Sequence, residues 1–134
     1  MSEHDDSRRI VGTLRQHGCM VQPIETKVRN GIPDLYIACR DGKKWVELKH
    51  VRANFDASKL IKVPFRPGQQ EWALEHLQAT GDTVSLLILF QDIGLFGMEL
   101  THLYPDKCVP MSKLYRIDGS EIGLATGIIK YLFN

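Results

Sequence analysis

The feature that most constrains the fold is a pair of strand-like segments, residues 34–40 and 43–49, separated only by Asp41-Gly42. Asp-Gly is a strong signal for a two-residue turn between antiparallel strands. Because a two-residue turn fixes the register of a hairpin, the sequence predicts which residues face one another across the two strands.

In this predicted register Arg40 faces Lys43 next to the turn, and Asp34 faces Lys49 at the open end of the hairpin. Side chains alternate between the two faces of a strand, so Glu47 projects from the same face as this pair. The opposite face carries apolar cross-strand pairs, Leu35 with Leu48 and Ile37 with Val46. The hairpin is therefore expected to have one apolar face and one face with two acids and a lysine at its end.

The two acids and the lysine have a specific chemical use. Two neighbouring carboxylates repel one another unless a cation lies between them, and Mg²⁺ takes hard oxygen ligands while keeping several waters. We therefore expect Asp34, Glu47 and the backbone carbonyl of Leu48 to bind Mg²⁺, for which Mn²⁺ can substitute. Lys49 is a candidate to position or deprotonate an attacking water, or to offset transition-state charge, in phosphodiester hydrolysis. The alternative is an Asp34–Lys49 ion pair that stabilises the hairpin by ~0.2–1 kcal/mol.

The rest of the pattern predicts an α/β fold with a mixed sheet. Residues 3–17 carry an apolar helical stripe, residues 67–80 read as a helix that ends at Gly81, and residues 83–90 (TVSLLILF) read as a strand buried on both faces. A strand, a helix and a buried strand in this order indicate a right-handed crossover. Further expected elements are a strand at 19–24, an edge strand at 94–100 and a final helix at 120–133.

Positive charge is concentrated in the first half of the chain. Residues 1–70 hold 13 Lys and Arg against 8 Asp and Glu, whereas residues 71–134 hold 4 against 8. Residues 50–66 are predicted to form a long, irregular, basic loop. The basic side chains around the proposed site are expected to contact phosphates without reading bases. They are Lys43, Lys44, His50, Arg52, Lys59, Lys62 and Arg66.

Composition limits the alternatives. The 134 residues suit a single domain, 1–134, and no stretch approaches the ~20 apolar residues that span a bilayer. The N-terminus has no apolar signal-peptide segment. Cys19, Cys39 and Cys108 are far apart and form no CxxC pair, which favours a reducing, intracellular setting over a zinc site or a disulfide framework. No organic cofactor and no membrane association are expected.

Three motifs in order resemble a known nuclease family. They are Gly31-Ile32-Pro33-Asp34-Leu35, Trp45-Val46-Glu47-Leu48-Lys49 and Gln69-Gln70-Glu71-Trp72. The pattern looks like the PD-(D/E)xK nuclease superfamily and, within it, resembles the VRR-NUC (virus-type replication-repair nuclease) group over about residues 3–90. The resemblance implies a restriction-endonuclease-like αβββαβ core with a divalent metal at the sheet edge, to which this chain adds a C-terminal helix within an extension at 91–134. It also implies that Asp34, Glu47 and Lys49 are catalytic, with Gln69 as a further site residue.

Two assignments within the resemblance have rivals. Gln70 is the neighbour of Gln69, but the Q-x-x-W spacing favours Gln69, which is otherwise a capping residue at a helix start. The family also uses an acid in its first helix. Glu3 is our choice as this further metal ligand and Asp6 is its rival, while either acid also suits a helix N-terminus electrostatically.

Stand-alone members of this group are similar to Holliday-junction resolvases, which are homodimers that cut two opposed strands of a branched DNA. The resemblance therefore implies a homodimeric endonuclease acting on branched or double-stranded DNA in the cytoplasm of a bacterial or phage-infected cell. The final helix is either the dimer surface or packs on its own core. Two alternatives stay open, a flap, nick or restriction-type endonuclease of the same fold, and a DNA-binding module without activity.

Overall fold

The structure is a computed structural model that describes residues 3–25, 31–91, 94–117 and 123–133, with side chains from residue 7 onward. Its helices are α1 (Glu3–Gln16), α2 (Gln69–Thr80) and α3 (Leu124–Phe133), with short 3-10 turns at Pro105–Lys107 and Met111–Lys113. Its strands are β1 (Met20–Pro23), β2 (Leu35–Cys39), β3 (Gly42–Val51), β4 (Leu60–Lys62), β5 (Val84–Phe90), β6 (Gly94–Leu100), β7 (Cys108–Pro110) and β8 (Tyr115–Arg116).

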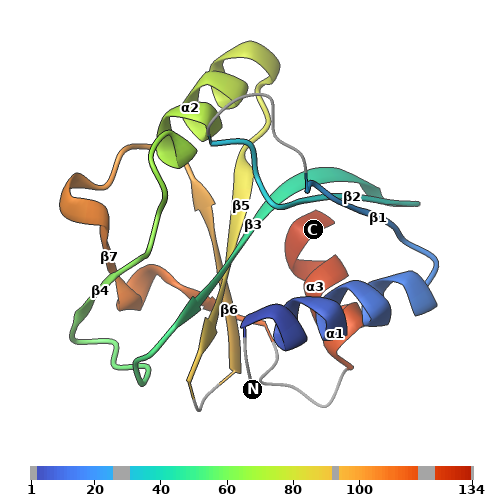
Figure 1. The fold of residues 1–134 in the computed structure, drawn as a ribbon, viewed down its shortest axis with the longest axis horizontal. Helices are drawn as coiled ribbons and strands as arrows, with labels where there is room; N and C mark the ends of the chain where they lie inside the picture. The colour runs from blue at the N-terminus through green and yellow to red at the C-terminus, as the bar shows by residue number, and fades with distance from the viewer. Residues whose placement is uncertain (1–2, 26–30, 92–93, 118–122, 134) are drawn as a thin grey trace.

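The central sheet has the strand order β1-β2-β3-β5-β6-β8. Strands β3 and β5 are parallel and α2 connects them, while the other neighbouring pairs in this sheet are antiparallel. Figure 1 shows this mixed sheet with helices on both sides, which confirms the predicted α/β fold. Strand β8 lies beyond β6, so the prediction that residues 94–100 form an edge strand was wrong.

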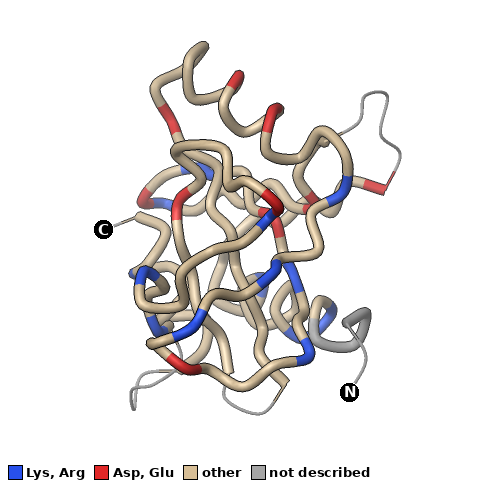
Figure 2. Tube along the Cα trace, turned by 90° about the vertical axis from the view of Figure 1, so that its left-hand side faces the viewer, with Lys and Arg blue, Asp and Glu red and all other residues tan. Residues whose placement is uncertain are grey.

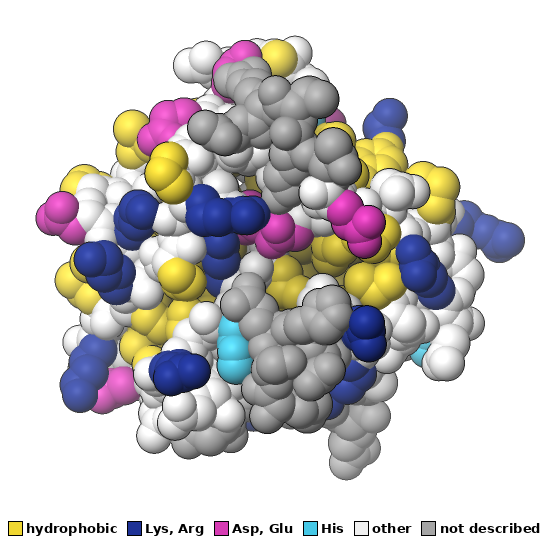
Figure 3. Space-filling view, viewed as in Figure 1, with side chains coloured by type: hydrophobic (Ala, Val, Ile, Leu, Met, Phe, Trp, Pro, Cys, Tyr) yellow, Lys and Arg dark blue, Asp and Glu magenta, His cyan; other side chains and the backbone are white. Residues whose placement is uncertain are grey.

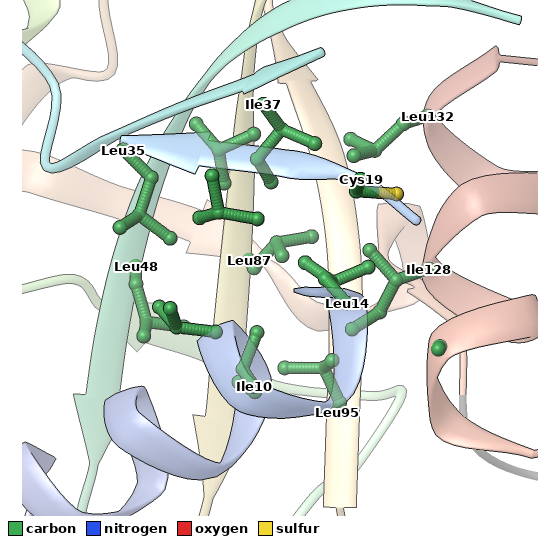
Figure 4. Close-up of a cluster of buried hydrophobic side chains, with 14 of the residues drawn as sticks. Ile10, Leu14, Cys19, Leu35, Ile37, Leu48, Leu87, Leu95, Ile128 and Leu132 are labelled. Atoms are coloured by element: carbon green, nitrogen blue, oxygen red, sulfur yellow. The ribbon is translucent and has the colours of Figure 1, made fainter. Parts of the chain in front are cut away.

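Helices α1 and α3 cover one face of the sheet (Figure 1). Ile10 and Leu14 from α1 meet Ile128 and Leu132 from α3 over Leu87 of β5, as Figure 4 shows. The apolar periodicity of α1 explains this packing, because its stripe faces the sheet. Of the two readings of the final helix, the structure shows packing on its own core. Ile122, which also belongs to the predicted dimer surface, lies outside the described residues.

The other face is covered by α2 and by a small sheet made of β4 and β7. Residues 60–62 pair with 108–110 in antiparallel register, so the prediction of an irregular loop across 50–66 was wrong for this part. Two phenylalanines anchor the segment: Phe65 is buried and Phe55 stacks on Phe96 with ring centroids 4.5 Å apart. The basic segment is therefore held against the sheet and not extended from it.

The register of the β2–β3 hairpin differs from the predicted one by two residues. Leu35 faces Val46 and Cys39 faces Gly42, which leaves Arg40 and Asp41 as the turn. Gly42 begins β3, and a Cβ there would lie 3.0 Å from the Phe133 ring of α3, so the glycine permits a close approach.

A shift of two residues keeps every side chain on its predicted face. Asp34, Glu47 and Lys49 therefore still share one face of the sheet. Continued by one residue beyond β2, the observed register puts Asp34 opposite Glu47, so the predicted cross-strand position of Asp34 opposite Lys49 was wrong.

A partly buried ionic network ties α3 to the sheet. The Glu99 carboxylate of β6 lies 2.8 Å from the Lys44 ammonium and accepts hydrogen bonds from Ser85 (2.7 Å), Thr83 (2.5 Å) and Tyr131 (2.7 Å). Burial raises the pKa of Glu99, but the hydrogen bonds from Lys44, Thr83, Tyr131 and Ser85 outweigh it and hold the pKa below its ordinary value. The charged form of Glu99 thus favours the folded state.

We expect Glu99→Gln to lower the free energy of unfolding by about 1–3 kcal/mol at neutral pH, because it removes a charge-assisted network. A carboxyl with a depressed pKa stabilises the fold above its unfolded-state pKa, and this contribution is lost as pH falls through the folded-state pKa. The difference between variant and parent should therefore shrink in acid. Urea unfolding at neutral and acidic pH measures it, with the exposed Glu71→Gln as the control. A pH-independent difference would contradict the role of the Glu99 charge.

Candidate metal centre

Asp34 lies directly before β2 and is held by two groups. Its Oδ2 accepts the Leu48 backbone N–H of the neighbouring strand at 3.3 Å, and its Oδ1 accepts a hydrogen bond from Arg66 Nη2 at 3.3 Å. Its backbone carbonyl accepts the N–H of Ile24 at 2.8 Å. The carboxylate is therefore tied to β3 on one side and to the segment before α2 on the other.

Glu47 is a buried carboxylate, with only 2 % of the residue exposed. Its Oε2 accepts a hydrogen bond from Gln69 Nε2 at 2.8 Å, and the Gln69 Oε1 accepts the backbone N–H of Arg66 at 2.7 Å. The two contacts together fix which end of the Gln69 amide carries the nitrogen. Taking a carboxylate out of water costs free energy, and buried ionisable groups of this kind are candidates for functional residues.

The two glutamines that open α2 have separate partners. Gln69 reaches Glu47, whereas the Gln70 side chain accepts the N–H of Tyr104 at 2.6 Å and faces the carbonyl of the same residue at 3.4 Å. Gln70 thus fastens the segment after β6 to α2. The geometry brings Gln69, and not Gln70, to the acidic pair.

Lys49 lies two residues beyond Glu47 on the same face of β3, and only 6 % of it is exposed. Its strand neighbours on β5 are apolar, Leu86 beside Glu47 and Ile88 beside Lys49. Electrostatic interactions are strong in such a setting because water screens them little. The Lys49 side chain therefore lies on the face of the sheet that also carries the two carboxylates.

Asp34, Glu47, Lys49 and the Leu48 carbonyl form the candidate site called the metal corner below. Its oxygen donors match a hard divalent cation. Asp34, Glu47 and the Leu48 carbonyl are the ligand types of Mg²⁺, which needs few protein ligands because it retains waters. Within the described ranges, no group of three or more His, Cys, Asp or Glu side chains is arranged to hold a metal. Any third carboxylate would have to come from elsewhere, and the side chains of the first-helix candidates Glu3 and Asp6 lie outside the described residues.

The predicted DNA-binding residues are in different settings. Lys43, Arg52, Lys59, Lys62 and Arg66 are exposed, and His50 is half-buried. Lys44 is held by Glu99 and Thr83 with 15 % of its side chain exposed, so its ammonium serves the internal network. Lys59 lies 3.8 Å from Asp56.

Charge is unevenly spread over the surface. Figure 3 shows acidic side chains near the centre of the face, with Lys and Arg side chains beside them on the left, where β4 lies. In Figure 2, α2 at the top carries acidic positions and most Lys and Arg positions lie below it. Positive charge is therefore concentrated near β3 and β4 and not along the outer side of α2.

Gly31 has a structural role next to the candidate site that the sequence pattern did not reveal. Its φ is +91°, and a Cβ there would lie 2.1 Å from the carbonyl oxygen of Gly68 and 3.0 Å from the backbone nitrogen of Gln69. The glycine lets the segment before Asp34 touch the start of α2. Its position three residues before Asp34 was the available signal, but nothing local in the sequence shows what it contacts.

No family model and no curated protein matches this sequence. The fold, with its mixed central sheet and C-terminal helix, is one that a DNA-junction resolvase also has. That protein is Hjc of Archaeoglobus fulgidus, a Holliday junction resolvase from an archaeal hyperthermophile, whose structure superposes with a TM-score of 0.50 at 10% identity. The match covers 70% of this chain and 74% of the resolvase. None of the helices in the described ranges has the length and apolar character needed to cross a membrane.

Proposed function

We propose that this protein is a metal-dependent, structure-selective DNA endonuclease that cuts four-way junctions. The observation that carries the proposal is the common face of Asp34, Glu47 and Lys49, with Gln69 bonded to the buried Glu47. The fold shared with a Holliday junction resolvase supports it, as do the PD and E-x-K motifs that resemble the PD-(D/E)xK nucleases.

Each residue has a role in this proposal. Asp34, Glu47 and the carbonyl of Leu48 would hold Mg²⁺, or Mn²⁺ in its place. When bound, the cation supplies Lewis-acid polarisation of the phosphate and a more acidic water. Gln69 orients the Glu47 carboxylate through its 2.8 Å hydrogen bond. Lys49 positions the attacking water and balances negative charge as the phosphodiester is cut.

DNA would lie across the exposed lysine and arginine side chains next to the metal corner. Arg66 is suited to a phosphate at the cut, because its guanidinium already lies beside Asp34. Lys43, Arg52 and Lys62 are exposed, and contacts from such side chains depend on the backbone and not on base sequence. We therefore expect affinity to fall steeply with salt.

The proposed assembly is a homodimer. One metal centre cuts one strand, and two-fold symmetry supplies a second centre for the opposed strand of a junction. Since the apolar side of α3 packs on its own sheet, the dimer surface would lie elsewhere. The proposed setting is the cytoplasm of a bacterial or phage-infected cell.

A single assay tests activity and substrate class. Labelled four-way junctions, flaps and plain duplexes are incubated with the protein in Mg²⁺, in Mn²⁺ and in EDTA, and the mass of the protein in solution is measured in parallel. We expect symmetric paired nicks in the junction, no cutting in EDTA, and a dimer mass.

Other outcomes separate the alternatives. Preferential cutting of flaps, nicks or duplex would replace the resolvase reading with another endonuclease of this fold. Tight junction binding without cleavage in Mn²⁺ would favour a binding module. Cutting that persists in EDTA and survives Asp34→Ala would refute the metal mechanism.

A further inference from the structure

A pocket of about 310 Å³ lies between the β2–β3 hairpin and the end of α2, on the face of the sheet that carries Asp34, Glu47 and Lys49. Ligand sites begin at about this size. Three residues with aromatic rings and five other polar or charged residues line it. The lining residues that matter here are Tyr36, Trp45, His76, Lys43, Asp82 and Thr83.

The aromatic wall is part of a continuous row of rings. Tyr36 and Trp45 have ring centroids 5.0 Å apart, Trp45 and Trp72 are 5.4 Å apart, and Trp72 stacks on His76 at 5.2 Å. The His76 Nδ1 lies 3.0 Å from the backbone carbonyl of Asp82, to which it donates. The rings therefore hold one another in place, and the wall is pre-formed.

This pocket adjoins the metal corner. Tyr36 faces Trp45 across the hairpin, and each lies two residues from an acid of the corner, Asp34 on one strand and Glu47 on the other. Two residues along a strand span about 7 Å and return to the same face. Lys43 lies a further two residues along β3 on that face and is exposed. The face thus presents, in order, carboxylates, aromatic rings and a cation.

We propose that this pocket binds one unstacked nucleobase of the DNA strand that is cut, next to the phosphate at the metal corner, with Lys43 at the following phosphate. The inference rests on the proposed function and adds a subsite to it. Every base has a flat face that stacks on aromatic side chains, so such a site needs no particular sequence. Of the charged lining residues, Lys44 is already paired with Glu99 at 2.8 Å and Asp82 repels anions, so the interior suits an uncharged base better than a phosphate.

The protein carries its own reporter for this pocket, because its sequence has two tryptophans, Trp45 and Trp72, and both belong to the aromatic row. In EDTA, where no cleavage is expected, tryptophan fluorescence is titrated with a short single-stranded oligonucleotide. The oligonucleotide is expected to quench the fluorescence as it binds. An abasic oligonucleotide of equal length is expected to bind without quenching.

Two variants distinguish the loss of base stacking from a failure of the protein to fold. Tyr36→Leu keeps apolar bulk, and His76→Ala truncates a half-buried ring, so at least one of the two should fold like the parent. Each is expected to weaken oligonucleotide binding by roughly 5- to 100-fold. Tyr115→Ala, an exposed tyrosine at the opposite edge of the sheet, is the matched control and should bind like the parent.

The fluorescence and binding results test the base pocket whether or not the protein cleaves DNA. Equal quenching by the abasic chain, or parental binding by both folded variants, would overturn the base pocket even if junctions are cut. Base-dependent quenching that Tyr36→Leu removes would support the pocket. If no substrate were then cut in Mg²⁺ or Mn²⁺, the proposed endonuclease activity would fail while the stacking site remained.

Discussion

Glu47→Gln is expected to reduce junction cleavage by at least about 10³-fold while the protein stays folded. The substituted side chain has the same shape, and its amide oxygen can still accept the hydrogen bond that Gln69 Nε2 donates to Glu47 at 2.8 Å. What disappears is the negative charge of a residue that is 2 % exposed and shares its face with Asp34. Single-turnover cleavage of a labelled junction in Mg²⁺ measures the rate, and circular dichroism checks the fold.

A second readout connects the loss to metal binding. A ligand that binds only the folded state raises the melting temperature, and the gain in unfolding free energy is about 2.7 kcal/mol at a ligand concentration 100 times Kd. We expect Mg²⁺ to stabilise the parent and to stabilise Glu47→Gln much less. Glu71→Gln makes the same change at an exposed position on α2 and should keep both responses. Cleavage by Glu47→Gln within tenfold of the parent would refute the assignment.

The sequence was sufficient to predict that the three candidate site residues share one face of the sheet, because that depends only on strand alternation. Asp34, Glu47 and Lys49 fell on one face in the predicted register and fall on one face in the observed register. The two registers differ by an even number of residues, which leaves the faces unchanged. Alternation is thus a more robust guide to a site than the exact cross-strand partner.

The partners of individual residues and strands depend on contacts between parts of the chain that are far apart in the sequence. Gly42 looked like a turn residue, but it belongs to β3, where it pairs with Cys39 of β2, and lies beside the Phe133 ring of α3. Strand β4 pairs with residues 108–110, which lie far along the chain. Lys44 looked like a surface cation until Glu99, 55 positions further along the chain, was found beside it at 2.8 Å. None of these three partners can be read from a local pattern.

Gly31→Ala is expected to lower cleavage by about 100-fold or more and to destabilise the protein by about 1–3 kcal/mol. A Cβ at this position would lie 2.1 Å from the Gly68 carbonyl oxygen, which is backbone and cannot rotate away. The φ of +91° adds strain for any L side chain. Relief requires the start of α2 to move away from the segment that carries Asp34. Because Gln69 lies at that helix start and bonds Glu47, the movement reaches the metal corner.

Gly12→Ala is the matched control, since it adds the same methyl group to a glycine elsewhere. In α1 a Cβ at Gly12 meets nothing within 4 Å, and alanine in a helix is favoured over glycine by about 0.5–1 kcal/mol. We therefore expect Gly12→Ala to raise the melting temperature and leave cleavage unchanged. Glycine to alanine should thus raise the melting temperature at position 12 and lower it at position 31. Parental melting and cleavage by Gly31→Ala would mean that the contact with Gly68 does not position Gln69 for its bond to Glu47.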